Sequence, residues 1–355
     1  MRRSAGWVRI VSLVVLVLAL GAFALQRLYV AGAFKTLTAH FAGSCAPVAG
    51  LLGPEDVTVH PRTGVAYISG YDRRSERAGR PARGALYAYD LTAAAPQLLN
   101  LTPSAEPDFA PHGISLLVGD AGRDSLFVVN HAGGRQAIEV YDLVDGDLSH
   151  RETLSDPLIR TPNDVVALDR DRIYVTNDHA NRSGFARTLE EWLRRPISDI
   201  IYYDGERWAV AASGIRYPNG VNASSDGEQL YVASTTGGEV LRFAIDPASG
   251  ALSERGAIAI GSGADNIEIG PAGDLWIGAH PNLLAFIQHA GDASLPSPSQ
   301  VVRVRAPSSD APVVEEVLLS LGDELSGSSA AAAWRDRLLV GAVFEDHFLD
   351  CHMGG

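Results

Sequence analysis

Residues 162–179 read PNDVVALDRDRIYVTNDH, and this stretch contains the unit from which the fold can be predicted. One apolar run precedes the charged segment Asp169–Arg172 and a second apolar run follows it. Short apolar runs on either side of a polar turn are typical of a β-hairpin. Asn163-Asp164 stand before the first run and Asn177-Asp178-His179 after the second, so both polar groups should lie at the open end of the hairpin.

The same hairpin recurs along the chain past residue 50. The centres of its second strands are 60, 47, 57, 45 and 63 residues apart. These centres are Tyr67, Phe127, Tyr174, Tyr231, Trp276 and Leu339. Further strand-like segments at 85–91, 137–143 and 239–245 fill the gaps. About four strands per repeat at this period is typical of propeller blades. The sequence therefore predicts an all-β, six-bladed β-propeller rather than a sandwich or a solenoid, with one short helix over 189–193.

The first 30 residues differ from the rest of the chain. Arginines precede an apolar run at 10–25 that only Ser12 interrupts. The run is short for a membrane span and long for the apolar core of a secretory signal. We expect residues 1–30 to be a signal peptide or a membrane anchor, and residues 31–355 to form the propeller domain. The protein would then be exported: secreted, periplasmic or membrane-anchored, facing an oxidising compartment.

Charge and cysteine content narrow the function further. The chain has 42 acidic and 29 basic residues, a formal charge of −13, which argues against nucleic acid as a partner and suits cations. Its two cysteines, Cys45 and Cys351, lie near opposite ends of the mature chain. In an exported protein such a pair predicts a disulfide, which would close the ring of blades; the alternative is two unrelated free thiols.

Polar residues open the first strand of each hairpin at comparable distances before the six centres. They are Glu55-Asp56, His112, Asn163-Asp164, Asn219, Asp265-Asn266 and Ser328-Ser329. The first strands are the candidates for the innermost strands, which line the channel of a propeller, so we expect one ring of polar side chains at one mouth. Carboxylates and amides gathered on an apolar wall need a cation, and hard oxygen ligands without cysteine favour calcium over zinc. Asparagine and aspartate are also common turn formers, but a turn role does not explain their recurrence in register.

The loops that follow the second strands should reach the same mouth. They carry His131, Asp178-His179, His280 and Phe344. Histidines beside a metal ring favour proton transfer. The sequence contains no G-x-S-x-G elbow, H-E-x-x-H helix, Walker loop or dinucleotide fingerprint. Metal-assisted attack by water is therefore the chemistry that these residues favour.

At these positions the sequence resembles the serum paraoxonase and arylesterase family of calcium-dependent lactonases. The matching stretches run in order along nearly the whole chain: 53–56, 111–115, 128–131, 162–165, 176–179, 219–222, 265–267, 274–278 and 280–282. The resemblance implies a six-bladed propeller with two calcium ions in its channel. It implies a catalytic calcium held by Glu55, Asn163, Asn219, Asp265 and Asn266. It implies a structural calcium held by Asp56, Asp164 and the backbone carbonyl of Ile114.

The resemblance also implies an activity: hydrolysis of small-molecule lactones and aryl or alkyl esters, with phosphotriesters as a promiscuous substrate class. His112 matches the family's proposed base and His131 its relay partner. We expect Tyr217, Phe286 and Phe344 to form the apolar wall that holds an acyl or aryl tail. We place Asp178, His179 and His280 in the same substrate-binding set. The N-terminal segment would mediate any association with a membrane.

Two segments depart from the family pattern, and two alternatives stay open. Residues 71–83 carry five arginines, and the loop at 185–195 is also distinctive; both should lie over the active-site face. The substrate preference of this protein is therefore not inferred from that of other family members. One alternative is a gluconolactonase-like or strictosidine-synthase-like propeller enzyme. The other is a non-catalytic calcium-binding propeller platform, which would show calcium-dependent stability without turnover.

Overall fold

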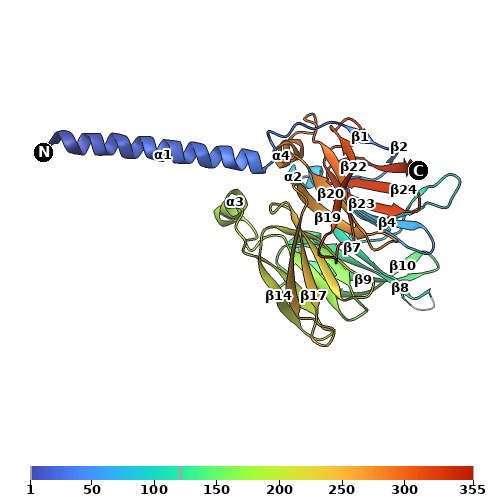
Figure 1. Ribbon diagram of the computed structural model, residues 1–355. Helices are drawn as coiled ribbons and strands as arrows, with labels where there is room; N and C mark the ends of the chain where they lie inside the picture. Colours follow the sequence, from blue (N-terminus) through green and yellow to red (C-terminus); the bar gives the residue numbers. More distant parts are fainter. Residues whose placement is uncertain (1, 120–121, 355) are drawn as a thin grey trace.

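The computed structural model describes residues 2–119 and 122–354, and it consists of a β-propeller preceded by one long helix (Figure 1). The described strands form six sheets of four strands, one of which carries a fifth. In each sheet, consecutive strands pair antiparallel from the innermost strand outward. The predicted all-β, six-bladed propeller is confirmed.

The blades follow one another along the chain. Blade 1 contains β3 (Pro54–Val59), β4 (Val65–Gly70), β5 (Ala85–Asp90) and β6 (Leu98–Asn100), and blade 2 contains β7 (Pro111–Leu117), β8 (Asp124–Asn130), β9 (Ala137–Val144) and β10 (Asp147–Leu154). Blade 3 contains β11 (Pro162–Ala167), β12 (Ile173–Asn177), β13 (Ser198–Tyr203) and β14 (Trp208–Ile215), and blade 4 contains β15 (Pro218–Ala223), β16 (Gln229–Ser234), β17 (Glu239–Ile245) and β18 (Leu252–Ala259). Blade 5 contains β19 (Gly263–Ile269), β20 (Leu275–His280), β21 (Ser299–Arg305) and β22 (Val313–Ser320), with β1 (His40–Phe41) at its edge. Blade 6 contains β23 (Ser328–Trp334), β24 (Arg337–Ala342), β25 (His347–Met353) and β2 (Gly43–Ala49).

The first strands of the blades line the channel, as predicted. β3, β7, β11, β15, β19 and β23 contact one another in a closed circle. All six predicted centres lie in the second strands β4, β8, β12, β16, β20 and β24. Apolar side chains of neighbouring blades pack together between the sheets; Tyr174, Tyr231 and Phe127 are among the largest fully buried ones. The repeated hairpin therefore builds both the channel wall and the core.

The N-terminal part of the propeller domain closes the ring. Strand β2 pairs with β25 and forms the outer strand of blade 6, so the two chain ends share one sheet. Cys45 of β2 is bonded to Cys351 of β25 across a sequence separation of 306 residues. The predicted disulfide is confirmed.

Removing this bond should lower the melting temperature. The double variant Cys45→Ala/Cys351→Ala should lose about 3–5 kcal/mol of stability, because the long loop that the bond closes restricts the unfolded chain. That loss corresponds to a melting temperature lower by roughly 5–15 °C for a domain of this size. Thermal unfolding under oxidising conditions measures the shift, and reductant should lower the melting temperature of the wild type but not that of the variant. Equal melting temperatures without reductant would show that the strand pairing alone holds the ring closed.

Short helices cover the side of the propeller that faces the long helix (Figure 1). They are α2 (Arg73–Arg77), α3 (Gly184–Leu193) and α4 (Leu283–Gly291); a short 3-10 helix, η2 (Ala132–Gly134), follows β8. The predicted helix at 189–193 is the end of α3, so its place is correct. The prediction of only one short helix is wrong, because α2 and α4 are helices as well. Helix α4 was missed because most of its residues are apolar, so it lacks an alternating polar face. Its start is fixed by Asn282, whose side chain accepts a hydrogen bond from the amide of Ala285 (3.1 Å).

Helix α1 (Arg2–Val30) extends away from the propeller (Figure 1). Its segment Ile10–Val30 has 21 residues with a mean hydropathy of 2.2 and no buried part, so it is long and apolar enough to cross a membrane. The chain after the helix is tied to the α4 side of the propeller: the amide of Leu283 donates to the carbonyl of Ala31 (2.8 Å), and Lys35 Nζ donates to the carbonyl of Gly261 (2.6 Å). The exposed helix and the disulfide fit an exported or membrane-anchored protein.

Candidate functional site

Each first strand loses its regular pairing where the predicted ring residues lie. The register shifts between Pro54 and Asp56 in β3, over 162–165 in β11 and over 264–267 in β19. The other three first strands shift at the equivalent place. Such a bulge leaves residues out of the ladder and redirects their side chains. The six blades thus present polar groups at one level of the channel.

The structure brings the predicted carboxylates and amides together and buries them. Each is at most 4% exposed: Glu55, Asp56, Asn163, Asp164, Asn219, Asp265 and Asn266. The strands approach so closely that a Cβ on Gly113 of β7 would lie 2.3 Å from Asp164 Oδ1. A separate and more exposed group of ligand-type atoms, in Glu345, Asp346 and His347, lies outside this ring.

Four oxygen atoms of the ring have no hydrogen-bond partner among the described residues. They are Glu55 Oε2, Asn163 Oδ1, Asn219 Oδ1 and Asn266 Oδ1, from four different first strands. A buried polar atom without a partner costs free energy, and native proteins rarely leave several together. Oxygen donors in this number are what calcium prefers. The donor set therefore fits a bound hard cation.

Asp56 and Asp164 repeat one arrangement in blades 1 and 3. Asp56 Oδ2 accepts a hydrogen bond from the amide of Ile114, and Asp164 Oδ2 accepts one from the amide of Val221, both at 2.7 Å. Burial and the charge of Glu55 raise the pKa of Asp56 to about 8. Burial and the charge of Asp56 raise the pKa of Asp164 well above its usual value. A divalent cation between them would relieve this repulsion. Ligation by the carbonyl of Ile114 stays a prediction.

His112 and His131 form a hydrogen-bonded pair. His112 Nδ1 lies 2.9 Å from His131 Nε2, and His131 Nδ1 lies 2.5 Å from the side-chain oxygen of Gln136. Because that oxygen can only accept, His131 carries its proton on Nδ1 and accepts through Nε2. His112 then donates a hydrogen bond from Nδ1, so its Nε2 carries no proton and keeps a free lone pair. This Nε2 lies 3.6 Å from Glu55 Oε1. Gln136 was not predicted, although it follows His131 by only five residues.

Near the His112–His131 pair, His131 is neutral and Glu55 is negatively charged. Burial and the neighbouring His112 lower the pKa of His131 to about 3, so His131 stays neutral and keeps its acceptor nitrogen. Burial alone would raise the pKa of Glu55, but His112 in its protonated form, Arg73 and a hydrogen bond from Asn266 lower it to about 2. Glu55 is therefore a carboxylate at neutral pH, as a ligand for a cation must be.

The other two predicted histidines are held by carboxylates. His179 Nδ1 lies 2.8 Å from Asp178, and its Nε2 lies 3.1 Å from Glu191 of α3. Burial lowers the pKa of His179, but these two contacts outweigh it and raise the pKa to about 9. His280 Nε2 lies 2.8 Å from Asp265 Oδ2. His179 therefore holds α3 in place through Glu191, and His280 holds the ring carboxylate of Asp265.

The three predicted aromatic residues pack around these histidines. Tyr217 contacts the ring of His179 edge-on at 4.7 Å between centroids, and Phe286 of α4 stacks on His280 at 3.8 Å. Phe344 lies beside Phe286 at 5.9 Å. Phe286 and Phe344 thus form one apolar pair beside His280, whereas Tyr217 packs separately against His179.

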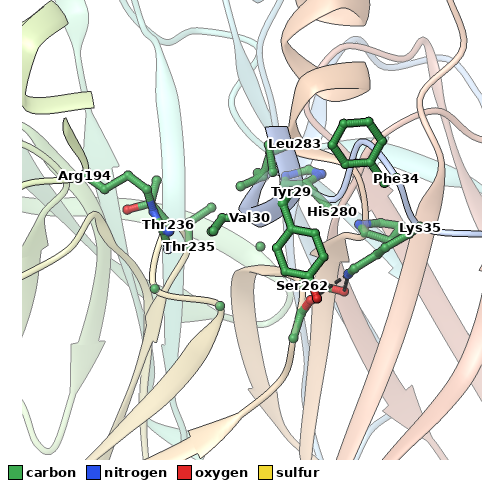
Figure 2. A pocket seen from close by; sticks show the side chains of 16 residues that line it. Tyr29, Val30, Phe34, Lys35, Arg194, Thr235, Thr236, Ser262, His280 and Leu283 are labelled. Carbon is green, nitrogen blue, oxygen red and sulfur yellow. Dashed lines mark hydrogen bonds between the residues drawn. The ribbon is translucent and has the colours of Figure 1, made fainter. Parts of the chain in front are cut away.

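A cavity of about 470 Å³ lies beside His280, between the end of α1 and the loops after β16 and β18 (Figure 2). Tyr29 and Phe34 form its apolar side, and Lys35 reaches across it to Ser262 (3.2 Å). The cavity is linked to the ring through His280, which lines it and whose Nε2 lies 2.8 Å from Asp265 Oδ2.

Comparisons with known proteins agree on the family. A family profile described as Arylesterase matches residues 52–353. Serum paraoxonase/arylesterase 2 of Rattus norvegicus is 32% identical over 301 residues, covering 82% of this chain and 84% of the relative. Serum paraoxonase/arylesterase 1 of Homo sapiens is 30% identical over the same share of both chains.

Solved structures with low identity share the fold. A calcium-binding protein, regucalcin, from Agrobacterium tumefaciens has a TM-score of 0.51 and 17% identity, covering 87% of this chain and 93% of the other. A luciferin-regenerating enzyme has a TM-score of 0.51 and 13% identity, covering 87% and 96%. At this identity the likeness shows the propeller fold alone.

Proposed function

The chain belongs to the arylesterase family, and we propose that it is a calcium-dependent hydrolase of lactones and of aryl and alkyl esters. The relatives are named as arylesterases, and the family resemblance of the motifs points to lactones as well. The observation that supports the proposal most is the set of unpartnered ring oxygens beside a histidine that keeps a free nitrogen lone pair.

The ring residues divide into two proposed calcium sites. Glu55, Asn163, Asn219, Asp265 and Asn266 would hold the catalytic ion. Asp56, Asp164 and the carbonyl of Ile114 would hold a structural ion deeper in the channel. When bound, the catalytic calcium supplies positive charge near the substrate carbonyl, where negative charge develops during attack.

The chain's own residues supply the proton transfer. His112 Nε2, unprotonated in this hydrogen-bond network, would accept the proton of the attacking water. His131 would hold His112 in this tautomer and stabilise the imidazolium that forms. Tyr217, Phe286 and Phe344 would exclude water around the acyl or aryl tail, while Asp178, His179 and His280 fix the loops that carry this wall. A lactone suits the site because its ring presents the carbonyl in one orientation.

Gln136 gives a test of the tautomer argument. Gln136→Met removes the acceptor for His131 Nδ1–H, so both histidines can adopt the other tautomer and His112 loses its free lone pair. We expect kcat to fall about 10-fold, the worth of one hydrogen bond, with KM unchanged. Steady-state kinetics with phenyl acetate measure both constants. Gln136→Glu keeps the acceptor oxygen and should retain at least wild-type kcat; equal losses in the two variants would refute the tautomer role.

The proposed function is tested with a panel of γ- and δ-lactones and phenyl acetate, assayed with calcium and after complete chelation. Turnover that disappears on chelation and returns with calcium is the expected result. Turnover that survives chelation would remove the metal from the mechanism. Calcium-dependent melting without turnover would favour the non-catalytic platform. Adding a phosphotriester to the panel tests the promiscuous activity.

The location of the protein follows from its N-terminal segment. We propose that residues 1–30 direct export and associate with a membrane, because Ile10–Val30 has a mean hydropathy of 2.2 and is not buried against the propeller. The propeller, residues 31–355, would then work in an oxidising compartment, where its disulfide is stable. Its partners would be small-molecule lactones or esters and not nucleic acid, because the net charge is −13.

A further inference from the structure

Helix α2 carries an arginine into the site. The helix begins at Arg73, and its start is fixed by Asp72, whose side chain accepts from the amide of Ser75 (2.9 Å). The next residue, Arg74, binds on the other side, to the carbonyls of Phe344 (3.2 Å) and His289 (3.0 Å). The segment is therefore tied down on both sides, and Arg73 is held towards Glu55.

The guanidinium of Arg73 lacks a hydrogen-bond partner within the described part of the chain. Its Nη2 lies 3.8 Å from Glu55 Oε2, which is an ion-pair distance but too long for a hydrogen bond. Its Nη1 is buried and unpartnered, and the side chain is only 12% exposed. A buried guanidinium with free donors is costly, since each donor has lost its water. The donors are thus available to a ligand.

The positive charge of Arg73 has no neutralising partner once the ring binds a cation. Glu55, its nearest carboxylate, would then neutralise calcium, and the cation would repel the guanidinium. Other carboxylates at this mouth are already paired, Asp178 with His179 and Asp265 with His280. An anion placed between the cation and Arg73 would satisfy both. A carboxylate suits this place because its two oxygens match the guanidinium fork.

We propose that Arg73 is a specificity-determining residue that binds a carboxylate carried by the substrate, so that the enzyme prefers anionic esters and lactones over neutral ones. This inference rests on the proposed hydrolase function and names its substrate class. It also gives a role to the arginine-rich segment 71–83, the departure from the family pattern in the sequence.

Two matched substrate pairs test it: phenyl hydrogen adipate against phenyl hexanoate, and γ-carboxy-γ-butyrolactone against γ-methyl-γ-butyrolactone. We expect the wild type to prefer the anionic member of a pair. In Arg73→Met, kcat/KM for the anionic member should fall about 100-fold, the range of a charged hydrogen bond, and for the neutral member less than about 3-fold. Arg73→Lys should restore part of the preference. Arg80→Met is the matched control, because Arg80 is exposed and its side chain donates a hydrogen bond to Ser75 of the same segment (3.1 Å) rather than pointing to Glu55.

A binding measurement separates this inference from the proposed function. Calorimetry of the calcium-loaded protein with 6-amino-6-oxohexanoate, which is anionic, and with hexanamide, its neutral counterpart, should show that Arg73→Met weakens binding of the anionic amide about 100-fold and leaves binding of the neutral amide unchanged. Melting temperature and calcium content of each variant confirm that it is folded and loaded. If the wild type hydrolyses no substrate but shows this binding pattern, the proposed function fails and the anion site stands. If Arg73→Met affects anionic and neutral compounds equally, or neither, the anion site is refuted.

Discussion

Replacing His112 by glutamine should lower kcat by about 10²- to 10⁴-fold, the usual contribution of a general base. Glutamine can still fill the space and bond to His131, but its amide cannot take a proton from water. His112 is not among the proposed calcium ligands, so calcium content should stay unchanged. The melting temperature should also stay close to that of the wild type, because the side chain belongs to no core cluster.

The measurement is single-turnover or steady-state hydrolysis of a lactone, together with calcium content of the purified variant. His150→Gln is the matched control: His150 is also paired with a carboxylate, Glu139 (2.9 Å), but it lies on an exposed outer strand of blade 2. Its kcat should not change. If His112→Gln kept full activity, another group would have to serve as the base, and the tautomer argument built on Gln136 would have no catalytic meaning.

The fold could be predicted from the sequence because it depends on a repeated pattern. Each hairpin combines an apolar first strand, a polar turn and an apolar second strand, and six copies leave few other architectures. The pairing of Cys45 with Cys351 followed from their positions at the two ends. Helix α4 could not be predicted in the same way, since most of its residues are apolar whether they face the propeller, as Phe286 does, or solvent, as Ile287 does.

The candidate site was predictable to the extent that its residues recur in register. Equal spacing identified Glu55, Asn163 and Asp265 as members of one ring, and the structure brings them together. Spacing could not identify Gln136 or Arg73, because neither position repeats between blades. Both act through side-chain geometry that only the folded loops define: the 2.5 Å contact to His131, and the 3.8 Å approach to Glu55.

The two enzymatic alternatives share the propeller fold, so the fold alone does not separate them. Structures with 13–17% identity share the propeller and nothing more can be taken from them. The relatives at 30–32% identity are named paraoxonase/arylesterase. The hydrogen-bonded pair of His112 and His131 beside Glu55 is the feature that favours the arylesterase chemistry over a gluconolactonase-like site.

The second large effect is expected for Glu55→Gln. The substitution keeps the shape of the side chain but removes the charge of a ring member whose Oε2 has no partner among the described residues. Calcium affinity should fall by about 100-fold or more, because a neutral amide binds a hard divalent cation much more weakly than a carboxylate. Activity at a fixed low calcium concentration should fall with it, and added calcium should restore part of it by mass action.

Calcium titration followed by calorimetry, and activity over the same concentrations, measure this effect. Glu139→Gln is the comparison: hydrogen bonds from Thr153 (2.6 Å) and Asn130 (2.9 Å) outweigh the burial of Glu139 and lower its pKa, so it is a carboxylate too, but it lies on β9 and outside the ring. If the net negative charge of the protein were all that mattered, the two variants would lose calcium affinity equally. A much larger loss for Glu55→Gln is expected, because a cation is held by the atoms that the protein leaves without partners, and these atoms belong to the ring.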